Sequence, residues 1–327
     1  MRLIQCLVAL CLLFGAHARA QDIHKDAHTG FPSQPIRIIV GNAAGGGNDI
    51  LARLVGQKLS DRLGQPVIVE NKPGASGIVA AQYVAKAAPD GTTLLVAPIG
   101  MLVVNPAVMP DLPYDPQRDF APISIMASFP LVLAVNAATP VHTVAELLAF
   151  TKAEPAKANA GGSGVVFQVV QKMFELKTGS QFQYVSYRST TDALTALLRG
   201  DLLMSLSDIG PIAGSLKDGR VRALAVTSGN RLPAWPQVPT MTEAGVTDME
   251  ISFWSGLVAP AGTPPAVVKT LQDNVMAVMQ MPDVRSALEA INVVPVGSTA
   301  DEFAARVARE LPMWSDVARS AHIRVEQ

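Results

Sequence analysis

Cysteine is missing from most of the chain, because Cys6 and Cys11 are its only two cysteines and both lie in the first twenty residues. Without these twenty residues the 327-residue chain has 307 residues and no cysteine. Such a chain forms no disulfide and has no thiolate chemistry, and this is compatible with export to an oxidising compartment. Its stability must come from hydrophobic cores, and the length predicts about two lobes.

Catalytic and metal-binding patterns are also missing. The histidines beyond residue 20 are His24, His28, His142 and His322, and none has the spacing of metal ligands. The chain contains no G-x-S-x-G elbow and no motif that pairs a nucleophile with a base. We therefore expect no enzyme activity, no metal and no cofactor. A secreted enzyme stays as the less favoured alternative, because catalytic triads are assembled in space.

Neither sign of charge is in excess. The chain has 26 Lys and Arg against 27 Asp and Glu, and its formal net charge is −1. This balance argues against nucleic acid as a partner. Beyond the first twenty residues, no uncharged apolar run is long enough for a membrane-spanning helix.

The N-terminus has the pattern of a secretory signal peptide. Arg2 supplies the positive charge, residues 3–15 form a short apolar run, and Ala18-Arg19-Ala20 is a small-x-small cleavage site. The run is too short to span a membrane comfortably, so a retained anchor is the less favoured alternative. We predict that residues 1–20 are removed and that the protein is periplasmic.

Glycine is abundant where a strand is expected to turn into a helix. Residues 36–40 have the pattern of a buried strand and residues 50–63 that of an amphipathic helix, with Gly45-Gly46-Gly47 between them. A second glycine-rich segment lies at residues 160–164. Such turns expose backbone N–H groups at the positive end of a helix, where a carboxylate or small anion can bind. Two of them on two lobes would form a clamp, whereas the alternative for each is a tight connection.

Strand and helix patterns alternate along the chain. Strands separated by helices predict parallel pairing, because parallel strands need crossover connections. The predicted strands are 36–40, 66–70, 92–97, 131–135, 183–187, 203–207, 221–227 and 253–259. The predicted helices are 50–63, one that opens at 74–77, one that opens at Thr143, one over 190–200, 265–279, 283–291 and one from Thr299 to about 319.

Short motifs follow one another in a fixed order along the chain. They are Gly45-Gly46-Gly47-Asn48-Asp49, Asn71-Lys72-Pro73-Gly74-Ala75, Ala88-Pro89-Asp90-Gly91-Thr92, Arg118-Asp119-Phe120-Ala121-Pro122, Gly219-Arg220-Val221-Arg222-Ala223 and Val238-Pro239-Thr240-Met241-Thr242-Glu243. The series resembles the Bug family of extracytoplasmic solute receptors, which serve tripartite tricarboxylate transporters. The resemblance covers nearly all of the chain beyond the signal peptide.

The resemblance implies an α/β fold of the two-lobe periplasmic binding protein (type II) arrangement, with parallel-rich sheets flanked by helices. Residues 31–128 and 254–327 would form lobe 1, and residues 129–253 would form lobe 2. A small organic acid would bind between the lobes and pass to integral-membrane permease subunits. A ligand-sensing receptor for a membrane signalling protein is the alternative, since lobe closure would work in the same way.

The expected ligand-binding residues come from both lobes, at strand ends and helix starts. They are Asn42, Ala43, Ala44, Gly45, Gly46, Asn48, Asp49, Ser76, Gly162, Ser163, Gly164, Ser189, Thr190 and Asp208. For Asp49 the stronger alternative is a helix cap paired with Arg53, four residues on. Tyr187 and Trp254 lie near strand ends, where core packing is the default.

One segment departs from the family pattern. Val165, Val166 and Phe167 stand where the resemblance implies hydroxyl side chains, and Gln168 stands in place of a histidine. One hypothesis is a ligand with a single carboxylate and a less polar distal end, such as an aromatic ring. The alternative is that Val165 and Phe167 pack beneath the helix.

Overall fold

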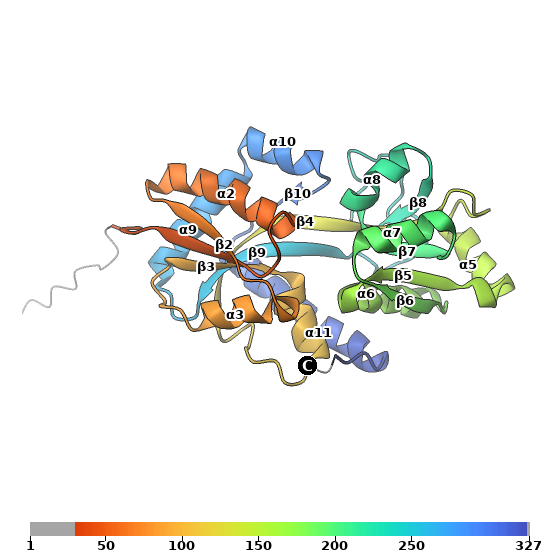
Figure 1. Ribbon diagram of the computed structural model, residues 1–327, viewed down its shortest axis with the longest axis horizontal. Helices are drawn as coiled ribbons and strands as arrows, with labels where there is room; N and C mark the ends of the chain where they lie inside the picture. The colour runs from red at the N-terminus through yellow and green to blue at the C-terminus, as the bar shows by residue number, and fades with distance from the viewer. Residues whose placement is uncertain (1–29, 326–327) are drawn as a thin grey trace, which may run out of the picture. The chain divides into compact units, whose positions relative to one another are not determined.

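The computed structural model describes residues 30–325 (Figure 1). The predicted signal peptide lies outside this range. Within residues 30–325, no helix is both long enough and apolar enough to cross a membrane.

The fold is mixed α/β and is built on a ten-stranded sheet with the order β2-β1-β3-β9-β4-β7-β5-β6, in which β8 and β10 also pair with β4. The strands are β1 (Ile36–Val40), β2 (Val67–Asn71), β3 (Thr93–Pro98), β4 (Phe120–Asn136), β5 (Asn159–Ser163), β6 (Gln183–Tyr187), β7 (Met204–Asp208), β8 (Val221–Val226), β9 (Ser252–Pro260) and β10 (Val294–Pro295).

Most helices follow the predicted periodicity and caps, whereas the helices over 105–108 and 209–217 were not predicted. Thr299 and Glu302 form the full capping box of the last long helix, and Ser189 caps the helix that ends before Gly200. The helices are α2 (Gly47–Leu63), α3 (Ile78–Ala85), α4 (Asn105–Val108), α5 (Val144–Ala153), α6 (Gly164–Thr178), α7 (Thr190–Arg199), α8 (Ile209–Lys217), α9 (Pro265–Met279), α10 (Pro282–Ala290) and α11 (Ala300–Ser320), with short helical turns η1 (Ala75–Gly77), η2 (Gly100–Val104) and η3 (Pro155–Lys157).

The long strand β4 differs from the prediction, which placed a strand only over residues 131–135. It has 17 residues, and it includes Pro122 and Pro130, which the sequence pattern favours as strand breakers. Residues 120–130 pair with β9, whereas residues 131–136 pair with β7 and β8. Strand β4 therefore belongs to both parts of the sheet (Figure 1), and both predicted lobe boundaries, near 128 and 253, fall inside long strands.

Parallel pairing is confined to the outer parts of the sheet. β1 pairs parallel with β2 and β3, and β5 pairs parallel with β6 and β7. The shared strands β4 and β9 pair antiparallel with each other. β9 also pairs antiparallel with β3, and β4 pairs antiparallel with β7. The predicted parallel units are thus present, and an antiparallel pair joins them.

The register makes the carboxyl ends of the two parallel units face each other. β3 ends at Pro98 beside Ser255, which pairs with Ala127 of β4. β7 runs in the opposite direction and ends at Asp208 beside Leu131 of β4. These two ends are four residue steps apart along β4, from Ala127 to Leu131, a span of about 13 Å at the rise of an extended strand.

The core contains a chain of aromatic side chains from both parts of the sheet. The ring of Phe167, on α6, lies 5.2 Å from that of Phe253 on β9, which lies 6.4 Å from Trp314 on α11. Trp254 is fully buried and donates a hydrogen bond of 2.8 Å to Glu310. The default prediction of core packing for Trp254 is confirmed.

Thr227 forms hydrogen bonds with both segments in which the backbone passes between the parallel units, β4 and the residues just before β9. Its hydroxyl oxygen accepts a 2.9 Å hydrogen bond from the Leu131 N–H of β4 and donates to the Ile251 carbonyl, just before β9. The side chain is fully buried. Both partners would lose a buried hydrogen bond without this hydroxyl.

We expect Thr227→Val to lower the free energy of unfolding by about 2 kcal/mol or more, because it leaves a buried donor and acceptor unpaired. Urea unfolding measures the change. Thr195→Val on exposed α7 is the matched control, since it removes a hydroxyl that bonds only the Thr191 carbonyl. An equal, small effect of both substitutions would contradict this role of Thr227.

Candidate functional site

The turn after β1 is an exposed loop of backbone donors. Residues 42–47 are all exposed, and Gly45 has a φ of 82°, which favours glycine. Helix α2 begins at Gly47, three residues before the predicted start, with Gly46 as its N-cap. Among the described residues, no acceptor receives a hydrogen bond from the N–H groups of Ala44, Gly47 or Asn48. These groups can bind an anion at the positive end of α2.

Asp49 holds this turn in shape. Its side chain is only 4% exposed and accepts hydrogen bonds from Gly45 N–H at 2.8 Å, Arg53 Nε at 3.0 Å and Asn71 Nδ2 at 2.9 Å. The hydrogen bond from Arg53 is the main cause that lowers the pKa of Asp49 to about 2. The predicted pairing with Arg53 is confirmed. The predicted capping position is wrong, because Gly46 is the cap and Asp49 the third helical residue.

A network of amides extends the turn to two neighbouring strands. Asn48 donates from its amide nitrogen to Asn42 Oδ1 at 2.9 Å and accepts from Ser255 Oγ of β9 at 2.5 Å. Asn71, at the end of β2, donates to the Asn42 carbonyl at 3.1 Å. Sequence reasoning missed Asn71 and Ser255 as members of this network. The position of Asn71 directly after a predicted strand was the available signal.

The turn after β2 has an unusual backbone. Gly74, Ala75, Ser76 and Gly77 have consecutive φ values of 143°, 43°, 53° and 87°. Positive φ at non-glycine residues costs roughly 1 kcal/mol each and occurs often at functional sites. Ser76 is exposed, and its carbonyl accepts a 3.2 Å hydrogen bond from buried Asn105. The helix predicted to open here begins only at Ile78.

The second glycine-rich segment differs from the expected turn. Gly162 and Ser163 belong to strand β5, and only Gly164, with a φ of 76°, lies at the start of α6. A Cβ atom on Gly162 would lie 2.7 Å from the Cβ of Phe167. Glycine is therefore needed there because the first turn of α6 packs closely over the strand. Sequence reasoning did not separate this packing role from anion binding.

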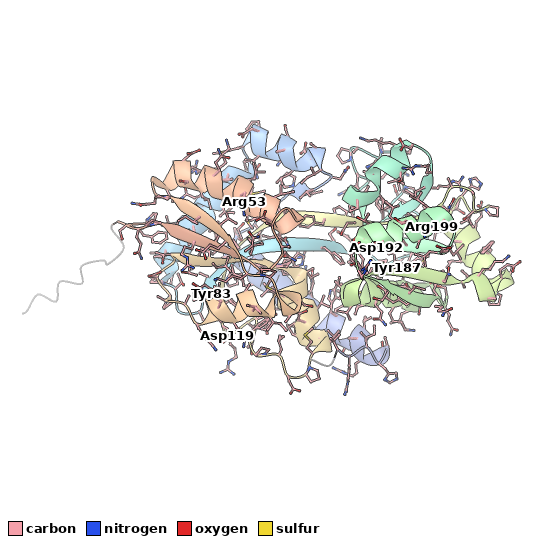
Figure 2. The ribbon with its side chains drawn as sticks, viewed as in Figure 1. Arg53, Tyr83, Asp119, Tyr187, Asp192 and Arg199 are labelled. Carbon is pink, nitrogen blue, oxygen red and sulfur yellow. The ribbon has the colours of Figure 1, made fainter. Side chains whose placement is uncertain are left out.

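The neighbouring strand end brings Ser189 and Thr190 beside Gly164. Ser163 pairs with Tyr187 across β5 and β6, so both strands end at the same edge. Ser189 caps α7 by accepting the Asp192 N–H at 3.1 Å, as expected from its position. Figure 2 shows Tyr187 and Asp192 together where β6 meets α7, and Arg53 on α2.

Asp208 completes this edge. It is the last residue of β7 and precedes α8, but its side chain does not cap that helix. No described residue donates a hydrogen bond to its carboxylate or forms an ion pair with it. Burial raises the pKa of Asp208 to about 6, although the residue as a whole is only half-buried.

Residues 165–167 do not all fit the same one of the two interpretations made from the sequence. Phe167 is 6% exposed and packs on Phe253, so for this residue the packing interpretation is confirmed. Val165 and Val166 contact the core but remain partly exposed beside Gly164.

The structure thus gathers the predicted residues into two groups on facing strand ends. The first edge contains residues 42–49 and Ser76. The second edge contains residues 162–164, Ser189, Thr190 and Asp208. Cavities of about 810, 500 and 360 Å³ lie elsewhere, beside Pro106 and Arg319, beside Met109 and Tyr114, and beside Leu102 and Ala304. Within residues 30–325, no group of three or more His, Cys, Asp or Glu side chains could hold a metal ion.

Comparison with known proteins places this geometry in a family. The family model "Tripartite tricarboxylate transporter family receptor" matches residues 51–321. The chain belongs to this receptor family. The family is one of binding proteins, and the resemblance seen in the sequence is confirmed.

Relatives and solved structures agree with this assignment. BugT of Bordetella pertussis is 33% identical over 294 residues, which cover 88% of this chain and 90% of BugT. R. palustris Rpa4515 with adipate is 31% identical, with a TM-score of 0.78, and the match covers 90% of this chain and 99% of that one. MatC from Rhodopseudomonas palustris with bound malate is also 31% identical, with a TM-score of 0.74 and coverage of 88% and 99%. The predicted fold class, a two-lobe periplasmic binding protein, is confirmed.

We expect Asp49→Asn to destabilise the protein by about 2 kcal/mol at pH 7. The lowered pKa means that the carboxylate contributes stability above its unfolded pKa, near 4, and loses it as the pH falls toward 2. The deficit of the variant should therefore shrink at pH 3, as measured by urea unfolding. Asp218→Asn, at an exposed ion pair, is the control and should change stability by less than about 0.5 kcal/mol. A deficit independent of pH would contradict this explanation.

We expect the opposite sign for Asp208→Asn. The raised pKa means that the folded state binds the proton more tightly, so the native carboxylate costs stability as the pH rises from 4 through 6. The amide removes this cost and should stabilise the protein by about 1–2 kcal/mol at pH 8, since partial exposure limits the gain. At pH 4 the gain should vanish. Urea unfolding at both pH values measures it, and destabilisation at pH 8 would overturn the assignment.

Proposed function

We propose that this receptor binds a small carboxylate between the first and second edges and delivers it to the permease subunits of a tripartite tricarboxylate-type transporter. The single observation that supports the proposal is the exposed turn 42–48. Its N–H groups at Ala44, Gly47 and Asn48 have no acceptor among the described residues. The relatives that carry adipate and malate support the ligand class.

The first edge suits an anion because its own charges are already balanced. Asp49 pairs with Arg53 in the first turns of α2, so its negative charge is compensated and its oxygens are occupied. The three free N–H groups and the dipole of the 17-residue helix α2 then provide a net positive potential at the loop. A ligand carboxylate would bind there through backbone donors, without a charged side chain.

Closure would bring the second edge onto the other end of the ligand. The two edges face each other across residues 127–131 of β4. Among residues 30–325 the backbone passes between the parallel units in β4 and in the segment at Ile251, just before β9. A ligand that contacts both edges stabilises the closed state by its differential affinity for the two states. Export through the predicted signal peptide would place the receptor in the periplasm.

A thermal-shift screen gives the first test of the ligand class. Acids such as adipate, malate and hexanoate should raise the melting temperature by mass action, whereas the matching amides should not. Stabilisation by neutral compounds alone would overturn the proposal.

Gly46→Val tests the anion turn directly. Gly46 has a φ of −75°, and a Cβ atom there would lie 3.4 Å from the Ala43 carbonyl oxygen, so the variant should fold. The branched side chain should shield the N–H groups and weaken binding of the best acid at least about tenfold, as expected for the loss of one charge-assisted hydrogen bond. Isothermal titration calorimetry measures the affinity.

The matched control is Gly214→Val, on the exposed side of α8, where a Cβ atom meets no atom within 4 Å. It should bind the acid like the unmodified protein. Unchanged affinity of a folded Gly46→Val variant would show that the loop does not hold the ligand.

A further inference from the structure

Asp208 is a charged group that the proposed anion site does not explain. It lies at the carboxyl end of β7, paired with Leu131 of β4, and so stands on the edge that faces the anion turn. Its carboxylate neither caps α8 nor meets a cation among residues 30–325. A partly buried carboxylate without a cation or donor partner is less favourable as an anion, and no contact within residues 30–325 explains an acidic residue here.

Two hydroxyl groups of the second edge, those of Ser189 and Ser163, already make hydrogen bonds. Ser189 accepts the Asp192 N–H at 3.1 Å, and Ser163 donates to the Arg188 carbonyl at 3.4 Å. The guanidinium of Arg188, which directly precedes Ser189, is 95% exposed and lies 3.7 Å from the carboxylate of Asp192. Its charge is therefore screened by solvent and already paired with Asp192.

The charge balance of the two edges is consequently different. Asp49 and Arg53 cancel on the first edge, whereas on the second edge Asp192 pairs with Arg188 and Asp208 has no cation partner among residues 30–325. The side chains beside Gly164 are Val165 and Val166, which provide no hydrogen-bond donor. A second ligand carboxylate would meet a net negative charge and few side-chain donors there.

We propose that Asp208 selects ligands whose distal end carries an N–H donor or a positive charge instead of a second carboxylate. This inference rests on the proposed function, since it assumes that the first carboxylate binds at the turn 42–48. A distal ammonium or amide would give Asp208 the partner that the fold lacks, so binding would recover its desolvation cost. A distal carboxylate would bring two like charges together in a partly desolvated place.

Three acids of equal chain length separate the possibilities. The probes are 6-aminohexanoate, adipate and hexanoate, titrated calorimetrically into the exported protein at pH 8, where Asp208 and both carboxylates of adipate are ionised. We expect 6-aminohexanoate to bind at least about tenfold more tightly than adipate, with hexanoate between them. The corresponding four-carbon set, 4-aminobutyrate, succinate and butanoate, covers a shorter site.

Asp208→Asn tests the residue itself. It keeps the shape and removes the charge, so the preference for the amino acid over the diacid should fall at least about fivefold. Asp218→Asn, at the other end of α8, removes the same charge and should leave the preference unchanged. Asp208→Ser is a second variant without the carboxylate, and it decides the matter if the amide variant does not fold.

The outcomes distinguish this inference from the proposed function. Diacids that bind as tightly as amino acids, with a ratio that Asp208→Asn does not change, would overturn the role of Asp208 and leave the carboxylate receptor standing. Failure of every acid in both sets to bind would overturn the carboxylate receptor together with this inference.

Discussion

The antiparallel pairing of β4 and β9 is the constraint on which the rest of the structure depends. The 17-residue strand β4 pairs with β9 along its first part and with β7 and β8 along its second part. Because β3 and β7 run in opposite directions beside it, their carboxyl ends face each other. Open α/β sheets typically bind ligands at the carboxyl ends of their strands, and this one pairing makes two such ends face each other.

The two edges use carboxylates in opposite ways. Asp49 is buried with three hydrogen-bond donors, and this environment stabilises its charge and fixes the turn. Asp208 is desolvated without a donor, and the same type of side chain is therefore destabilised as an anion. The first arrangement leaves backbone N–H groups unpaired at the positive end of α2. The second leaves a carboxylate without a partner among residues 30–325.

Local sequence patterns were sufficient for most elements. Capping residues such as Thr299 and Ser189, and left-handed glycines such as Gly64 and Gly200, place helix ends within a few residues because each satisfies a local backbone requirement. The full length of β4 could not be predicted in the same way. Pro130 resembles a strand breaker, and only its position at the junction between two sets of partner strands makes it acceptable.

The sequence by itself determined the family, the α/β class, the glycine turn after β1 and the pairing of Asp49 with Arg53, because these depend on neighbouring residues or on ordered motifs. The tertiary structure alone decided which glycines face solvent and which allow close packing. Gly46 is exposed, whereas Gly162 lies beneath Phe167. It also decided that Asn71 and Ser255 support the first edge and that Asp208 stands without a partner, since such contacts join residues that are far apart in the chain.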